Sequence, residues 1–195
     1  EQIVAAAAAV GLLLSLLIAF TLSMAVDRFN VRRELMVDEA NAVGTTDLRA
    51  RMLPLAFSAP IRAILREYVD VRLEYGRSAY DDAKLQRALL RTKELQDQLW
   101  RHSVALAREA RDPITSIFLQ SLNETIDLSE KRLAALENRV PVAVWIMLVL
   151  IATLACIVVG ATVRRRYWLA MLISPVMIAV AMGFVADLDS PRTGL

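Results

Sequence analysis

Apolar and polar positions are segregated along this chain into long blocks. The stretches 3–26, 142–163 and 167–186 contain no charged residue, whereas 27–141 holds nearly all of the charge. About 20 apolar residues in a helix rise far enough to cross the ~30 Å hydrocarbon core of a bilayer. The alternative, buried core helices of a soluble protein, would need a larger polar region than 27–141 to cover them. The pattern therefore predicts three transmembrane helices.

The polar block shows helical spacing throughout, and no run alternates apolar and polar residues with period two. We expect the first membrane helix to continue over 27–53, with Gly44 as a candidate break and a stop before Pro54. A second helix is expected from Ser58 to about Gly76. Its apolar face consists of Ile61, Ile64, Leu65, Tyr68 and Val69.

Two further helices are expected in the same block. One covers about 80–111, and its charged residues are predicted to form a solvated face. The other begins with Asp112 as N-cap and Pro113 at the first helical position, and it ends at Pro141.

The predicted fold class is all-α, with multi-pass transmembrane helices and a helical extramembrane bundle inserted between the first and second membrane segments. The order is a transmembrane helix at 3–26, an extramembrane domain at 27–141, a helix at 142–163, a short arginine loop at 164–166, a helix at 167–186 and the start of a C-terminal tail at 187–195. The chain begins without Met and stops just past an apolar segment, so we expect both ends to be cuts in a longer protein.

Composition excludes several classes. The chain has 23 Lys+Arg and 21 Asp+Glu, a net charge of +2, and no basic face, so nucleic acid is not an expected partner. Cys156 is the sole cysteine, which excludes a disulfide framework. His102 has no Cys or His near it in the sequence, and glycine-rich phosphate loops, calcium loops and nucleophile elbows are absent. We predict that no residue acts in catalysis or binds a metal ion or a cofactor, and that the protein is not an enzyme.

Small residues recur at four-residue spacing in two membrane segments. Gly11, Ser15, Ala19 and Ser23 form such a line, and Asp27 continues it; Ala179 and Gly183 lead in the same way to Asp187. Small faces allow helix backbones to approach closely in lipid. They are expected to pack within one subunit or, alternatively, around a subunit axis. In the second case acids at the membrane boundary would form carboxylate rings, as in cation pores; the candidates are Asp27, Asp187 and Asp189.

An acidic motif follows the first membrane segment. On a helix Asp38 and Asn41 share a face and Glu39 points elsewhere. Because Arg32 and Arg33 precede them by a turn or two, charge pairs within one helix are the simple interpretation.

The same motif carries a family resemblance. Residues 38–45, with Asp38, Glu39, Asn41 and Gly44, are followed by Leu-Arg at 48–49, Leu-Pro at 53–54 and an Asp-Leu-Asp motif at 187–189. This pattern resembles the bacterial bestrophin-like family of unknown function, which is remotely related to the pentameric bestrophin ion channels. The resemblance implies a homo-oligomer and an ion channel, without assigning pore residues. It also implies one more membrane helix before this chain and a short tail after it.

We therefore expect an integral protein of the bacterial inner membrane whose partners are the lipid bilayer, further copies of itself and small ions. The alternative is a non-conducting, membrane-anchored interaction or sensor module. Three arginines at 164–166 in a short loop favour a cytoplasmic loop and an extracytoplasmic domain. Basic residues that flank the membrane on the domain side, and the bestrophin analogy, favour the opposite orientation.

Overall fold

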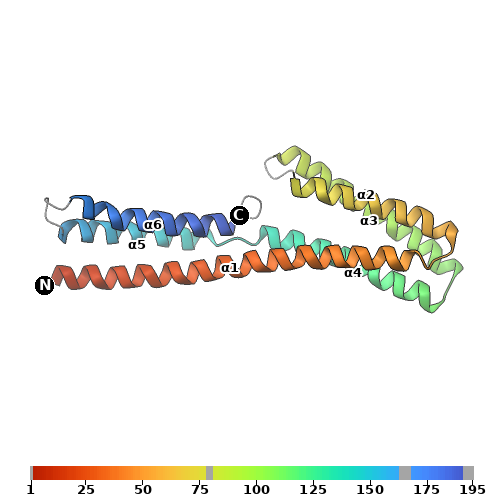
Figure 1. The fold of residues 1–195 in the computed structure, drawn as a ribbon, viewed down its shortest axis with the longest axis horizontal. Helices are drawn as coiled ribbons and strands as arrows, with labels where there is room; N and C mark the ends of the chain where they lie inside the picture. The colour runs from red at the N-terminus through yellow and green to blue at the C-terminus, as the bar shows by residue number, and fades with distance from the viewer. Residues whose placement is uncertain (1, 78–80, 163–167, 191–195) are drawn as a thin grey trace. The chain divides into compact units, whose positions relative to one another are not determined.

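The chain forms six helices in the computed structural model, which describes residues 2–77, 81–162 and 168–190. They are α1 (Gln2–Ala50), α2 (Leu55–Arg77), α3 (Asp82–Glu109), α4 (Pro113–Glu137), α5 (Val142–Thr162) and α6 (Trp168–Asp189) (Figure 1). The described residues contain no strand, which confirms the all-helical class. The predicted arginine loop at 164–166 and the tail residues 191–195 lie outside the described residues.

Most predicted helix ends are close to the observed ones. Asp112 caps α4 as expected, because its Oδ1 accepts a hydrogen bond of 2.7 Å from the N–H of Thr115. The candidate break at Gly44 was wrong, since α1 continues through it; one glycine in a helix costs only about 1 kcal/mol relative to alanine. The predicted start of α2 at Ser58 was also wrong, because the carbonyl of Pro54 already accepts the N–H groups of Phe57 and Ser58.

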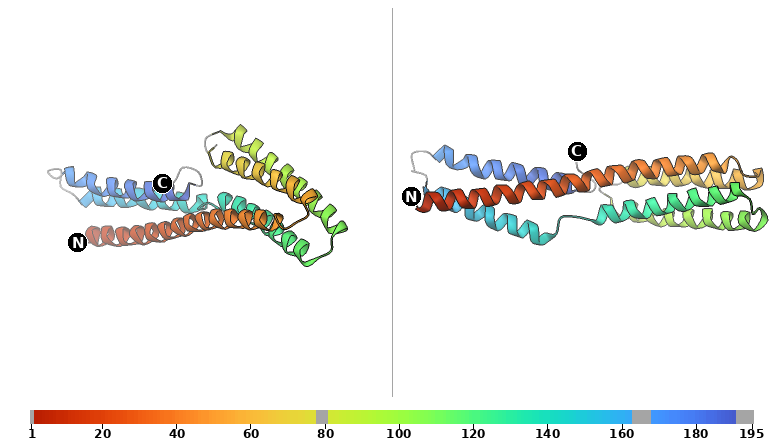
Figure 2. Two further views of the ribbon diagram at one scale, coloured as in Figure 1. Left: turned by 45° about the vertical axis from the view of Figure 1, so that its right-hand side comes forward. Right: turned by 90° about the horizontal axis from the view of Figure 1, so that it is seen from below.

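The chain divides into two compact units, 1–31 with 136–195 and 32–135. The first contains the N-terminal part of α1 together with α5 and α6, and the last two lie side by side (Figures 1 and 2). Its core is small and is formed by Leu14, Ala152 and Ala155 with partly buried neighbours. Many of its large apolar side chains point outward; for example, Leu12 is 73% and Met177 68% exposed. An apolar exterior of this extent indicates contact with lipid or with another protein.

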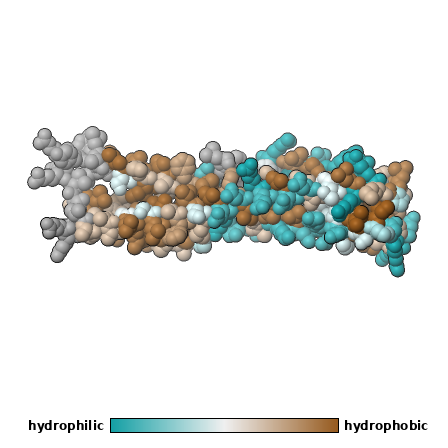
Figure 3. Space-filling model, turned by 60° about the horizontal axis from the view of Figure 1, so that its bottom comes forward, coloured by the Kyte–Doolittle hydropathy of each residue, from teal (hydrophilic) through white to brown (hydrophobic). Residues whose placement is uncertain are grey.

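Figure 3 shows hydrophobic side chains, in brown, over this first unit. Three stretches in the described residues are long and apolar enough to cross a membrane; they lie within Ala5–Ala50, Pro113–Ala161 and Leu172–Asp189. The apolar part of the second stretch is α5. These helices are compatible with the predicted membrane location.

The second unit is a helical bundle built from residues 32–50 of α1 and from α2, α3 and α4. Helices α2 and α3 lie side by side in both views of Figure 2. The bundle core is a single cluster of buried side chains: Ala50, Leu53, Ile61, Leu65, Leu99, Leu106, Phe118 and Leu122. Buried hydroxyls add a polar layer, in which Thr46 of α1 and Thr125 of α4 share a hydrogen bond of 2.9 Å.

Candidate functional site

A buried carboxylate in the second unit is the centre of the most connected polar cluster that the structure describes. Glu39 lies on α1 and is only 3% exposed. It shares the buried face of α1 with Ala42, Thr46 and Ala50, which follow it at helical spacing. Its neighbours Asp38 and Asn41 are exposed, and so is Gly44. The helix therefore directs one residue of the acidic motif into the bundle.

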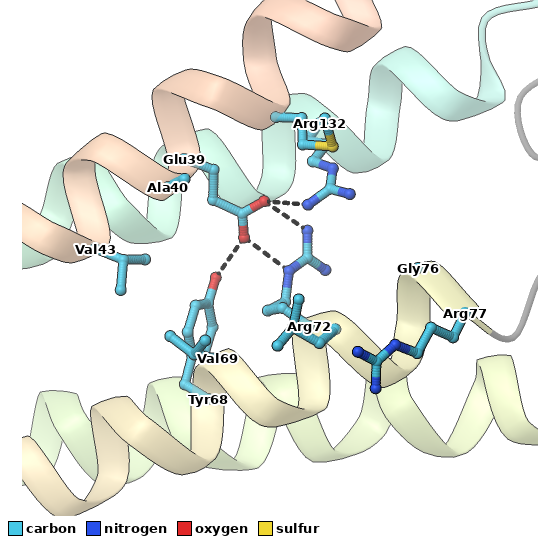
Figure 4. Close-up of a pocket in the computed structure, with 11 residues that line it drawn as sticks. Glu39, Ala40, Val43, Tyr68, Val69, Arg72, Gly76, Arg77 and Arg132 are labelled. Carbon is cyan, nitrogen blue, oxygen red and sulfur yellow. Dashed lines mark hydrogen bonds and ion pairs between the residues drawn. The ribbon is translucent and has the colours of Figure 1, made fainter.

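Three side chains from two other helices bind Glu39 (Figure 4). Arg72 of α2 donates from Nε to Oε1 at 2.7 Å and from Nη2 to Oε2 at 2.9 Å, so this pair is bidentate. Arg132 of α4 donates from Nη1 to Oε2 at 2.8 Å. The hydroxyl of Tyr68, one turn before Arg72, donates to Oε1 at 2.8 Å. The Glu39 carboxylate thus joins α1, α2 and α4.

The electrostatics of the cluster favour the ionised form of Glu39. Burial by itself raises the pKa of the Glu39 carboxyl, but hydrogen bonds and charge from Arg72, followed by Arg132 and Tyr68, outweigh burial and lower this pKa below its ordinary value. Burial and the Glu39 charge raise the pKa of Tyr68 to about 12. The pKa of Arg72 is also raised, because its bonds to Glu39 outweigh the effect of burial. At neutral pH the cluster is an anion held by two cations and a neutral phenol.

A cavity of about 410 Å³ opens beside this cluster, between α1 and α2. Apolar side chains of both helices form most of its wall, and its polar part consists of Glu39, Tyr68, Arg72, Arg77 and Arg132. Arg72 also lies over the ring of Tyr75, 5.2 Å from the ring centroid. A concave, mostly apolar wall with a few charged groups is typical of a small-molecule site.

A second, more exposed charge cluster lies further along α1. Asp47 accepts hydrogen bonds from Nη2 of Arg51 at 2.7 Å and from Nε of Arg62 at 3.0 Å. Burial by itself raises the pKa of Asp47, but the hydrogen bonds and charges of Arg51 and Arg62 together outweigh burial and lower this pKa. Because all three side chains are partly open to solvent, the pairs contribute little to stability.

The predicted membrane-boundary acids lie in different environments. Asp27 is exposed and Asp187 is half-buried. Asp189 is buried; its Oδ1 and Oδ2 accept from the N–H of Val140 at 3.0 and 3.2 Å, and its Oδ1 lies 4.0 Å from Nη1 of Arg28. Asp189 therefore anchors the end of α6 to Val140, two positions before α5 begins.

The predicted small-residue faces point away from the core of the first unit. The residues of both faces are exposed: Gly11, Ser15, Ala19, Ser23, Ala179 and Gly183. The core of that unit uses Leu14 of α1 instead, with Val10 and Ile18 partly buried beside it. Among the described residues, no group of three or more His, Cys, Asp or Glu side chains could hold a metal ion.

Sequence reasoning missed the partners of Glu39. Tyr68 was assigned only to an apolar face, and neither Arg72 nor Arg132 was assigned as a partner of an acid. One signal was present: Arg72 follows Leu65 and Tyr68 on the apolar stripe of α2, and a cation on a buried face requires an anion. The sequence does not say which of many acids that anion is.

Comparison with known proteins gives one positive result, a match to a family profile. No curated protein and no solved structure matches the chain. The sequence profile of the Bestrophin-like domain, in contrast, matches residues 3–195. This match covers the three apolar helices, the bundle with the Glu39 cluster and the Asp187–Asp189 motif. The chain therefore belongs to the bestrophin-like family.

Proposed function

We propose that this protein is a homo-oligomeric, channel-like protein of the bacterial inner membrane, without enzymatic activity. The observation that carries the proposal is the exposed face of α1 formed by Gly11, Ser15, Ala19 and Ser23. Small residues favour helix association in lipid. Within the described chain, none of these four residues belongs to the core cluster of the first unit. In the proposal, the same face of α1 from a second copy of the chain packs against this face. Asp27 continues the face at the membrane boundary, where several copies would place a ring of carboxylates around a pore.

In this proposal residues 27–141, which include the bundle formed by 32–135, are the extramembrane body, inserted between the first and second membrane segments. Its mixed charges and closed apolar core suit water, whereas the apolar exteriors of α5 and α6 suit lipid. We place the body outside the cytoplasm because of the arginines at 164–166. Alkaline phosphatase, which is active only outside, tests this when fused after Leu195. High activity supports an extracytoplasmic body, and no activity with a stable fusion contradicts it.

Conductance of the purified full-length protein in planar bilayers tests the channel. We expect ion currents, and we expect Asp27→Asn to change the cation-to-anion permeability ratio. The matched control is Asp38→Asn, which removes an exposed acid from the same helix beyond the membrane segment and should leave selectivity unchanged. A correctly assembled oligomer that does not conduct over a range of voltage, pH and calcium concentration contradicts the proposal.

The second candidate is a non-conducting interaction or sensor module. The observation that favours it is the apolar interior of the membrane segments, which contain no Asp, Glu, Lys, Arg or His along 3–26, 142–163 or 167–186. Cross-linking that recovers one defined partner protein, together with a monomeric or dimeric mass, would select this candidate over a channel.

A further inference from the structure

The cavity beside Glu39 lies wholly within the bundle unit and has a chemically divided lining. Its apolar side consists of side chains from α1 and α2, chiefly Met36, Val43, Val69 and Leu73. Met36 is 48% and Leu73 is 51% exposed, so apolar surface is left open to solvent at this place. Its volume of about 410 Å³ lies in the lower part of the range of roughly 300–1,000 Å³ found for small-ligand sites.

The charged side of the cavity has an excess of cations. Three guanidinium groups line it, from Arg72, Arg77 and Arg132, against the single carboxylate of Glu39. Arg72 and Arg132 bind that carboxylate. Arg77 lies further along α2, outside the hydrogen-bonded cluster (Figure 4), and it forms no ion pair with any described residue. The lining therefore carries a local charge of about +2 next to an apolar wall, where an anion is stabilised more than in water.

We propose that this cavity binds a single-chain amphiphilic carboxylate, such as a long-chain fatty acid. The carboxylate group pairs with Arg77 and with the N–H groups of Arg72 and Arg132 that Glu39 does not use; a guanidinium has five N–H donors, and a carboxylate matches its geometry. The acyl chain lies along Met36, Val43, Val69 and Leu73 and covers their exposed apolar surface. The inference does not depend on ion conduction.

Size and charge select this occupant over others. The cavity is near the lower limit for small-ligand sites, which suits one acyl chain rather than the two chains of a phospholipid. Its excess positive charge disfavours a cationic or neutral amphiphile, because the arginines would then lose solvation without gaining a partner. A helix from a second copy of this chain could also cover the apolar wall, and the experiment separates that case.

Photo-cross-linking of the full-length protein in nanodiscs tests the proposal directly. The probe is a palmitic acid that carries a diazirine in its chain, and mass spectrometry identifies the labelled peptides. We expect labelling of the segments that contain 36–43 and 69–73, in addition to the lipid-facing helices. Excess unlabelled palmitate should abolish the labelling of these bundle segments, whereas hexadecanol, which has the same chain and no charge, should not.

Two variants test the two ends of the proposed ligand, and each has a matched control variant. Arg77→Glu and Leu73→Gln should each lower the labelling of the bundle segments about tenfold, because each removes contacts to one end of the ligand. Arg101→Glu and Leu90→Gln alter an exposed arginine and an exposed leucine on α3, outside the cavity lining, and should not lower it. Circular dichroism of every variant establishes that the bundle is folded.

Several results would overturn the proposal. It fails when labelling is confined to the apolar helices, when Arg77→Glu and Leu73→Gln label as strongly as their controls, or when hexadecanol competes as well as palmitate. It also fails when a two-chain anionic phospholipid competes better than palmitate. A disulfide that forms between subunits of a Leu73→Cys variant, with no palmitate labelling, would show instead that a second copy covers the cavity.

Discussion

At the scale of single residues, Glu39 shows what sequence reasoning can and cannot reach. Helical spacing alone separates Glu39 from Asp38 and Asn41, and the structure buries only the first of these. Its partners Tyr68, Arg72 and Arg132 lie 29, 33 and 93 positions away along the chain. Periodicity acts over one or two turns, so it carries no information about which distant helix faces which. The partner set depends on how the helices of the bundle pack.

Replacing Glu39 by alanine should strongly destabilise the bundle. The change leaves the guanidinium groups of Arg72 and Arg132 largely buried without their anion, and breaking a buried pair in this way costs about 3–5 kcal/mol. Chemical denaturation of the detergent-solubilised protein, followed by circular dichroism, measures the free energy of unfolding. The control Asp38→Ala removes an exposed acid one position earlier and should change it by less than about 0.5 kcal/mol. Equal effects of the two substitutions would contradict the structural role of Glu39.

The lowered pKa of Glu39 predicts an acid-dependent loss of stability. The pKa of this carboxyl is lower in the folded than in the unfolded chain, where its ordinary value is 4.5. Its contribution is therefore complete above about pH 4.5 and decreases as the pH falls towards the folded-state pKa. The difference in unfolding free energy between the wild type and Glu39→Gln should stay constant from pH 7 to pH 5 and then shrink. A difference that grows on acidification would refute this assignment.

At the scale of elements, the sequence predicted the positions of helices better than it predicted the partners of single residues. Uncharged stretches located α5 and α6, and Asp112 with Pro113 located the start of α4. These signals are local: a run of apolar residues, or a cap within one turn of its helix. The errors arose where two local signals compete. Ser58 is a good N-cap in isolation, but the carbonyl of Pro54 begins the helix earlier and places the Ser58 side chain in the buried face.

Continuity of α1 through Gly44 can be tested by substitution. A Cβ placed on Gly44 meets no atom within 4 Å, so alanine fits without strain. Gly44→Ala should stabilise the bundle by up to about 1 kcal/mol, because glycine loses more backbone entropy in a helix. Denaturant unfolding of the full-length protein measures the change. Destabilisation instead would mean that the helix breaks at Gly44, or that another molecule contacts this face.

At the scale of the whole molecule, the two units differ in how much apolar surface they leave exposed. The bundle closes its own core around Phe118 and Leu122, while the other unit leaves most of its apolar side chains outside. Charge is segregated along the sequence in a similar way: the three uncharged stretches lie in the first unit, and most charged residues lie within 32–135. The sequence could not show which faces of the membrane helices remain uncovered, since small residues pack equally well within one chain or between chains.

A bulky residue on the small face of α1 should therefore prevent assembly without unfolding the subunit. Ala19 is exposed at the middle of the face, and Ala19→Leu would keep two copies of α1 from approaching closely. Ala6→Leu is the matched control, because Ala6 is exposed on the same helix and lies roughly opposite Ala19 at about 100° per residue. Light scattering of the detergent-solubilised protein should give an oligomeric mass for the wild type and Ala6→Leu, and a monomeric mass for Ala19→Leu. An Ala19→Leu protein that keeps the wild-type mass would show that subunits meet elsewhere, and a pore that Asp27 surrounds would then have no structural basis.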